Sequence, residues 1–261
     1  MQWSSLATQF CLQLGFGVLA ALAFVPRAPV GVLFYRVMGT TALVPLLAAV
    51  LMPVYVGGAP WNDAPTLLGG LAVIGYPIYS GPVRGARWAL ALGLALLGSA
   101  AALVVLLARG TLVEGPLALA VASLSALATG AVAGSIGLAM VLGHWYLTVP
   151  NLQIRHLQRL NRVTVVCLAL SLAALIGSCL VFGAALGAAQ PPLLGPWGLF
   201  YLGTRIAVGL LLPLLFAWMV SGSLAYQNTR SATGILYASS VLVLIGTAVS
   251  VSLTDSYGVP L

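Results

Sequence analysis

The chain has 261 residues, of which 61% are apolar and only 5% are charged. A soluble domain carries about 25% charged residues, so the composition excludes a soluble enzyme and indicates a polytopic membrane protein. All ten basic residues are arginines and only three residues are acidic, which gives a formal net charge of +7. In a membrane chain this excess is a topology signal, and we expect no nucleic-acid partner.

Eight stretches are long and apolar enough to cross a bilayer, for which about 20 residues are needed. In chain order they are residues 5–25, 30–52, 65–81, 86–108, 117–143, 164–188, 198–222 and 232–253. Proline and glycine separate them, and Gly75 with Pro77 interrupts the third and shortest stretch. The sequence therefore predicts an all-α integral membrane protein, an eight-transmembrane-helix bundle forming a single polytopic membrane domain over residues 1–261.

The charged residues of the loops segregate by membrane face. One face receives seven arginines: Arg27, Arg84, Arg87, Arg155, Arg159, Arg162 and Arg230. The opposite face receives Asp63, Arg109, Glu114 and Asp255. By the positive-inside rule the seven-arginine face is cytoplasmic, so we predict a bacterial inner-membrane protein with both termini on the non-cytoplasmic side.

The cytoplasmic connection from Thr148 to Arg162 has helical amphipathic periodicity, with leucines on one side and polar residues on the other. We predict one cytoplasmic interfacial amphipathic helix there. Its arginines, Arg155, Arg159 and Arg162, would contact anionic lipid or an acidic partner surface. The alternative is a positive-inside anchor without a partner.

The fifth span is rich in small residues and contains a GxxxG pair, Gly130 and Gly134. Because such pairs let helix backbones approach closely, we predict that this helix lies at the centre of the bundle. The alternative is that the pair forms a homodimer seam.

Two arginines lie inside spans, Arg36 in the second and Arg205 in the seventh, and no acidic residue lies inside any span. A charge at membrane depth is costly unless it pairs, faces water or snorkels to the headgroups. We therefore take each as a candidate binding residue. Around Arg205, Tyr201 and Thr204 complete a second intramembrane polar site.

The fifth span ends in Gly143-His144-Trp145-Tyr146 at the cytoplasmic interface. A quinone fits this cluster, because histidine exchanges protons, arginine stabilises negative charge and aromatic rings stack on the quinone ring. The predicted site, for a quinone or an anion, consists of Arg36, His144, Trp145, Tyr146 and Tyr35. The alternative is an interfacial histidine bonded to a loop carbonyl within an ordinary aromatic belt.

The sequence has no metal-ligand motif, no nucleotide-binding loop and no histidine pair placed to hold a haem. Its three cysteines lie singly in apolar segments. We expect no catalytic residues, no metal site and no cofactor bound covalently or by metal ligation; a quinone is the candidate cofactor.

These features favour an integral-membrane subunit of a larger, quinone-linked electron-transfer complex, with membrane lipids and redox or other membrane subunits as partners. In size and helix count the chain resembles the eight-span quinone-site subunits of the polysulfide-reductase group. The resemblance is architectural and assigns no residue a role.

Two alternatives are open. One is a transporter for a small solute or anion that uses Arg36 and Arg205. A short likeness between residues 31–36 and 198–205 favours it, because these segments run in opposite directions, as in an inverted repeat, although chance also produces such matches. The other is a membrane scaffold or assembly protein.

Overall fold

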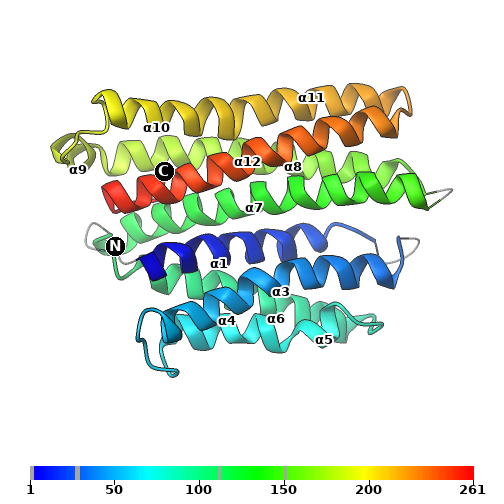
Figure 1. The fold of residues 1–261 in the computed structure, drawn as a ribbon, viewed down its shortest axis with the longest axis horizontal. Coiled ribbons are helices and arrows are strands. Elements are labelled where there is room, and N and C mark those ends of the chain that lie inside the picture. The colour runs from blue at the N-terminus through cyan, green and yellow to red at the C-terminus, as the bar shows by residue number, and fades with distance from the viewer. Residues whose placement is uncertain (1–2, 27–29, 111–112, 150–151) are drawn as a thin grey trace.

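A computed structural model describes residues 3–26, 30–110, 113–149 and 152–261, and all regular secondary structure in these ranges is helical (Figure 1). In chain order the helices are α1 (Trp3–Leu22), α3 (Val32–Tyr55), α4 (Ala64–Ile74), α5 (Tyr76–Tyr79), α6 (Ala86–Leu107), α7 (Gly115–Thr148), α8 (Arg155–Val181), α9 (Gly183–Ala188), α10 (Pro196–Ile206), the π-helix η1 (Ala207–Leu211), α11 (Leu212–Ala225) and α12 (Thr229–Tyr257).

Seven helices of the described chain are long and apolar enough to cross a membrane, when α10, η1 and α11 are taken as one continuous helix. Large apolar side chains such as Leu180 and Trp218 are exposed on the sides of the bundle, as expected for a surface that faces lipid. The prediction of an all-helical membrane bundle is confirmed to this extent. The third predicted span is the pair α4 and α5, which breaks at Gly75 as the sequence predicted.

The predicted interfacial amphipathic helix is wrong. Residues from Arg155 onward are the first turns of α8, which continues without a break to Val181. Leu157 and Leu160 are buried in the bundle core together with Leu224. The apolar side of this segment therefore packs on neighbouring helices rather than on lipid headgroups. An amphipathic periodicity is expected in both cases, so the sequence did not distinguish them.

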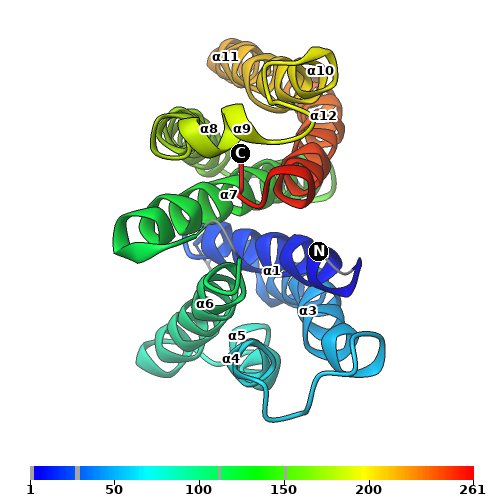
Figure 2. The same ribbon diagram turned by 90° about the vertical axis from the view of Figure 1, so that its left-hand side faces the viewer.

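The helix α7 lies at the centre of the bundle, as predicted, and packs against α1, α6, α8 and α12 (Figure 2). Its two GxxxG glycines face α1. A Cβ atom on Gly134 would lie 1.9 Å from the carbonyl carbon of Gly17, and one on Gly130 would lie 2.4 Å from the carbonyl oxygen of Gln13. The GxxxG pair therefore joins two helices of the same chain through their backbones.

The helices form two four-helix units with the same order of contacts. In the first unit α1 packs on α3, α3 on α4, α4 on α6, and α6 on α1. In the second unit α7 packs on α8, α8 on α11, α11 on α12, and α12 on α7. The units meet along α1 and α7, which run in the same direction (Figures 1 and 2).

A short sequence recurs at the same place in both units. Residues 96–100 read Leu-Leu-Gly-Ser-Ala in α6, and residues 244–248 read Leu-Ile-Gly-Thr-Ala in α12. A Cβ atom on Gly98 would lie 2.6 Å from the carbonyl oxygen of Leu68 in α4, and one on Gly246 would lie 2.3 Å from the Cα atom of Gly209 in η1. In each unit the fourth helix thus touches the backbone of the third helix at this glycine.

These correspondences show that the two four-helix units share one order of helix contacts and one close glycine contact. They do not pair the second predicted span with the seventh. The second span is α3, the second helix of the first unit, whereas the seventh is α10 to α11, the third helix of the second unit. The two segments also differ in environment, since Arg36 is exposed and Arg205 is buried. The structure therefore does not support an inverted repeat built on these two arginines.

Both described chain ends lie at one end of the bundle, here called the termini end (Figure 1). The helices α6, α8 and α12 begin at the opposite end, here called the arginine-rich end, and carry most of its basic residues. Of the seven loop arginines predicted for one face, six lie there and are exposed: Arg84, Arg87, Arg155, Arg159, Arg162 and Arg230, whereas Arg27 lies outside the described residues. The segregation predicted from the loops is therefore present in the folded chain.

At the termini end Arg109 donates two hydrogen bonds to the Asp63 carboxylate, with distances of 3.0 and 2.6 Å. This hydrogen bonding lowers the pKa of the Asp63 carboxyl below its ordinary value. Asp63 is the residue before α4, and Arg109 follows the end of α6. The ion pair therefore ties the ends of two helices that already pack side by side.

The α1–α7 contact gives a direct test. We expect Gly134→Leu to lower the thermal midpoint of the detergent-purified chain strongly, because overpacking against a backbone costs about 1–3 kcal/mol or more. Gly137→Leu is the matched control, since no atom lies within 4 Å of a Cβ built on Gly137. Equal midpoints for the two variants would contradict the proposed role of the contact.

The ion pair predicts a pH effect. Because the pKa of Asp63 is lowered in the folded chain, its contribution to stability is present above the ordinary carboxyl pKa of about 4 and is lost as the pH falls through the lower folded value. The pair is partly exposed, so we expect a contribution of at most about 1 kcal/mol. Asp63→Asn should remove this part of the acid-dependent loss of thermal stability, whereas Glu114→Gln, at an exposed acid of the same end, should retain it.

Candidate functional site

Arg205 points into the bundle and does not snorkel. It lies in the last turn of α10, about 14 Å from the first residue of that helix at 1.5 Å per residue, and only 1% of it is exposed. Its Nη2 donates hydrogen bonds to Thr129 Oγ1 at 2.7 Å and to Ser171 Oγ at 3.0 Å. The guanidinium therefore joins α10 to α7 and α8 in the interior.

The backbone after Arg205 widens into the π-helix η1. One turn beyond Arg205, Gly209 faces Gly246 of α12, and a Cβ atom on Gly209 would lie 2.8 Å from the Cα atom of Gly246 and 3.3 Å from Arg205 Nη1. Two backbones thus meet beside the guanidinium with no side chain between them. Single-turn π-helices of this kind occur frequently at functional sites.

The surroundings of Arg205 do not neutralise its charge. Its two hydroxyl partners are neutral, and its Nε is buried without a hydrogen-bond partner. The chain's three acids are at the termini end: Asp63 is paired with Arg109, and Glu114 and Asp255 are exposed. Since a buried ion costs several kcal/mol unless it is compensated, this uncompensated cation is the most unusual electrostatic feature of the described chain.

The predicted partners of Arg205 lie elsewhere. Tyr201 is 40% exposed on the side of the bundle, and Thr204 Oγ1 donates to the carbonyl oxygen of Phe200 at 2.8 Å. The actual partners, Thr129 and Ser171, are 76 and 34 positions away in the sequence. Sequence reasoning missed them because single hydroxyls in apolar helices are common and carry no indication of what they face.

The structure places Arg36 and Tyr35 on different sides of α3. Tyr35 is fully buried, and its hydroxyl donates to the carbonyl oxygen of Val25. Arg36 lies about one turn into α3 and is exposed, which fits the snorkelling alternative.

The histidine and its aromatic neighbours also separate. His144 is exposed, and its Nδ1 lies 3.4 Å from the hydroxyl of Tyr237 in α12. Trp145 Nε1 donates to the carbonyl oxygen of Val30 at 3.3 Å, and the Tyr146 hydroxyl donates to the carbonyl oxygen of Gln153. Of the predicted cluster, Trp145 and Tyr35 both contact the ring of Phe34. No described contact joins Arg36 to His144.

The three arginines predicted to contact lipid or a partner, Arg155, Arg159 and Arg162, are exposed on the first turns of α8. The guanidinium of Arg159 lies 5.9 Å from the centre of the Phe24 ring.

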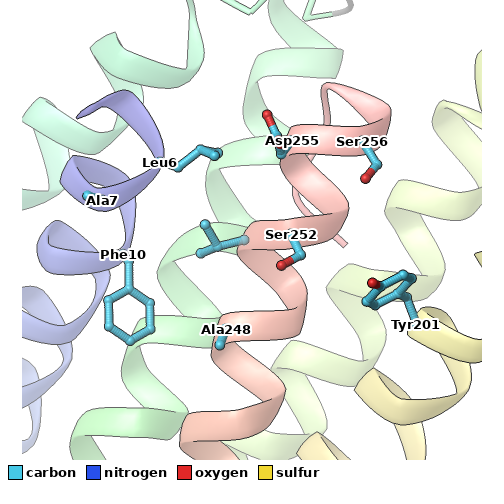
Figure 3. A pocket seen from close by; sticks show the side chains of 9 residues that line it. Leu6, Ala7, Phe10, Tyr201, Ala248, Ser252, Asp255 and Ser256 are labelled. Atoms are coloured by element: carbon cyan, nitrogen blue, oxygen red, sulfur yellow. The ribbon is translucent and has the colours of Figure 1, made fainter. Parts of the chain in front are cut away.

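A groove opens on the side of the bundle between α1, α10 and α12, here called the lateral groove (Figure 3). Its volume is about 480 Å³. It is lined by Leu6, Ala7, Phe10, Tyr201, Ala248, Val251, Ser252, Asp255 and Ser256. The sequence did not reveal it, because three helices from both four-helix units contribute to it.

Figure 3 shows Phe10 on α1 and Tyr201 on α10 on either side of α12, whose Ser252 and Asp255 follow one another along the helix. A second cavity of about 690 Å³ at the termini end is also lined by Asp255, together with Arg109 and Gln190. Asp255 therefore lines both the groove on the side of the bundle and the cavity at the termini end.

Within the described ranges, no three His, Cys, Asp or Glu side chains lie close enough together to hold a metal ion. The three cysteines, Cys11, Cys167 and Cys179, are free and half-buried. Comparisons with protein-family models, with curated proteins and with solved structures find no match to this chain.

Proposed function

We propose that the chain is an integral-membrane subunit of a larger, quinone-linked electron-transfer complex, and that the quinone binds in the lateral groove. The observation that carries the proposal is that apolar walls and hydrogen-bonding side chains meet in this groove. Its volume of about 480 Å³ lies in the range of ligand sites. Leu6, Phe10 and Val251 suit an isoprenoid tail, and Tyr201 and Asp255 suit a ring bearing carbonyl oxygens.

The groove residues supply binding and proton exchange, while the quinone itself carries the electrons. The Tyr201 hydroxyl is a hydrogen-bond donor for a ring oxygen. Asp255 also borders the cavity at the termini end, so its carboxylate is placed to exchange a proton between the groove and that end. Electrons would enter and leave through redox groups of a partner subunit.

We further propose that the chain crosses the bacterial inner membrane eight times with both termini outside. Three observations support this topology. The pair α4 and α5 packs beside α3 and α6, which are both long enough to cross. The described chain ends lie at one end of the bundle (Figure 1), and all exposed arginines except Arg109 gather at the other.

Binding of a fluorescent or photoreactive quinone analogue to the detergent-purified chain tests the groove. We expect Tyr201→Phe and Asp255→Asn each to raise the dissociation constant about 5- to 10-fold, the cost of one hydrogen bond. Tyr237→Phe and Asp63→Asn are the matched controls, because both side chains lie outside the groove, and they should leave binding unchanged.

Two results would overturn this location. If Arg36→Gln or His144→Ala weakens binding while the groove variants do not, the quinone binds at the arginine-rich end, as the sequence predicted. If the unaltered chain binds no analogue, the quinone function itself is wrong. Purification in mild detergent adds a separate check, since the chain should be recovered in fixed ratio with a partner that carries a flavin, haem or iron–sulfur group.

A further inference from the structure

We propose that the buried guanidinium of Arg205 binds a small inorganic anion of the halide class, held between α7, α8 and α10. This inference goes beyond the proposed function, because it involves neither the lateral groove nor a quinone. It names a ligand for the one buried charge in the described chain that the rest of the fold leaves uncompensated.

The charge balance points to an anion. Arg205 is 1% exposed, so water does not solvate it from outside, and its side-chain partners Thr129 and Ser171 carry no charge. Arginine does not lose its proton at any ordinary pH, so it cannot escape the burial cost by becoming neutral. A negatively charged ligand beside the guanidinium would supply the missing compensation.

The hydrogen-bond inventory points the same way. Arginine has five N–H donors, and only those on Nη2 have described partners that accept from it. Nε is buried and has no partner. A buried donor without an acceptor is costly, and an anion beside Nε would accept from it while neutralising the charge.

The size of the available space limits the ligand. Arg205 does not line any of five prominent cavities, whose volumes run from 110 to 690 Å³. A quinone ring or a large carboxylate metabolite requires a cavity of that order. A single dehydrated halide ion does not, so the halide class fits the site best.

Two further hydroxyls lie on the side of Arg205 that leads to the termini end. Ser123 precedes Thr129 on α7 and lies nearer the start of that helix, and Ser178 follows Ser171 on α8 and lies nearer its end. Both are buried, and neither Oγ has a hydrogen-bond partner. The two helices that hold Arg205 thus carry two further buried hydroxyls without partners, each nearer the termini end.

Chloride is the probe for the test. The full chain is purified in detergent, and its thermal midpoint is measured as sodium gluconate is replaced by sodium chloride at constant ionic strength. Since a ligand that binds only the folded state raises its stability, we expect a saturable rise of about 5 °C. Arg205→Gln should abolish the rise, and Arg36→Gln, at the exposed arginine, should retain it.

A second pair of variants keeps the test decisive if Arg205→Gln does not fold. Ser171→Ala retains the charge but removes one of the two groups that hold the guanidinium in place, so the chloride concentration for half the rise should increase about tenfold. Ser99→Ala is the control, because Ser99 is equally buried but lies in the first four-helix unit, on α6.

Three results would overturn the proposal. The first is an unaltered chain whose midpoint does not depend on chloride. The second is an Arg205→Gln variant that keeps the full dependence. The third is a Ser171→Ala variant with the same half-saturating concentration as Ser99→Ala. None of these results bears on the lateral groove, so a failure here is distinguishable from a failure of the quinone proposal.

Discussion

The backbone contact between α1 and α7 is the constraint on which the rest of the structure depends. Gly17 and Gly134 have no side chain between them, so the two helices approach more closely than any other residue type would permit. Each of these helices also forms part of one four-helix unit. Their crossing therefore fixes how the two units lie against each other and where helices of both units meet to form the lateral groove.

The shared order of contacts describes the packing of the two four-helix units but not their chemistry. Gly98 and Gly246 make equivalent contacts in the two units, and the hydroxyl that follows each glycine donates to its own helix. The third helix of each unit is irregular, but in different ways: it breaks at Gly75 in the first unit and widens into η1 in the second. Only η1 lies next to a buried charge, that of Arg205. The two units therefore share an architecture, but only the second contains a buried arginine.

Scarcity of charge gives each ionised group a large effect in this chain. Arg36 and Arg205 both appear as intramembrane arginines in the sequence, yet one is exposed near a helix end and the other is fully buried. The difference follows from what each helix faces, since α10 presents Arg205 to hydroxyls of α7 and α8. No described carboxylate lies near Arg205, so the fold itself leaves this buried charge uncompensated.

The sequence by itself determined the helices and the two ends of the bundle. Each helix must be long and apolar enough to cross the bilayer and must satisfy its own backbone hydrogen bonds, so its span and the break at Gly75 can be read from the local sequence. The loop arginines likewise mark one end of the bundle without any knowledge of the packing. Even the central place of α7 followed from its small residues, because glycine is useful in a membrane helix chiefly where another backbone approaches.

Only the tertiary structure decided which side chains meet. The periodicity of the segment after Arg155 is the same whether its leucines face lipid headgroups or the neighbouring helices, and packing selected the second. The partners of Arg205, the separation of Arg36 from His144 and the lateral groove all depend on how helices distant in the chain are rotated against one another. That rotation is fixed by close packing between helices, so it cannot be derived from the sequence of one helix alone.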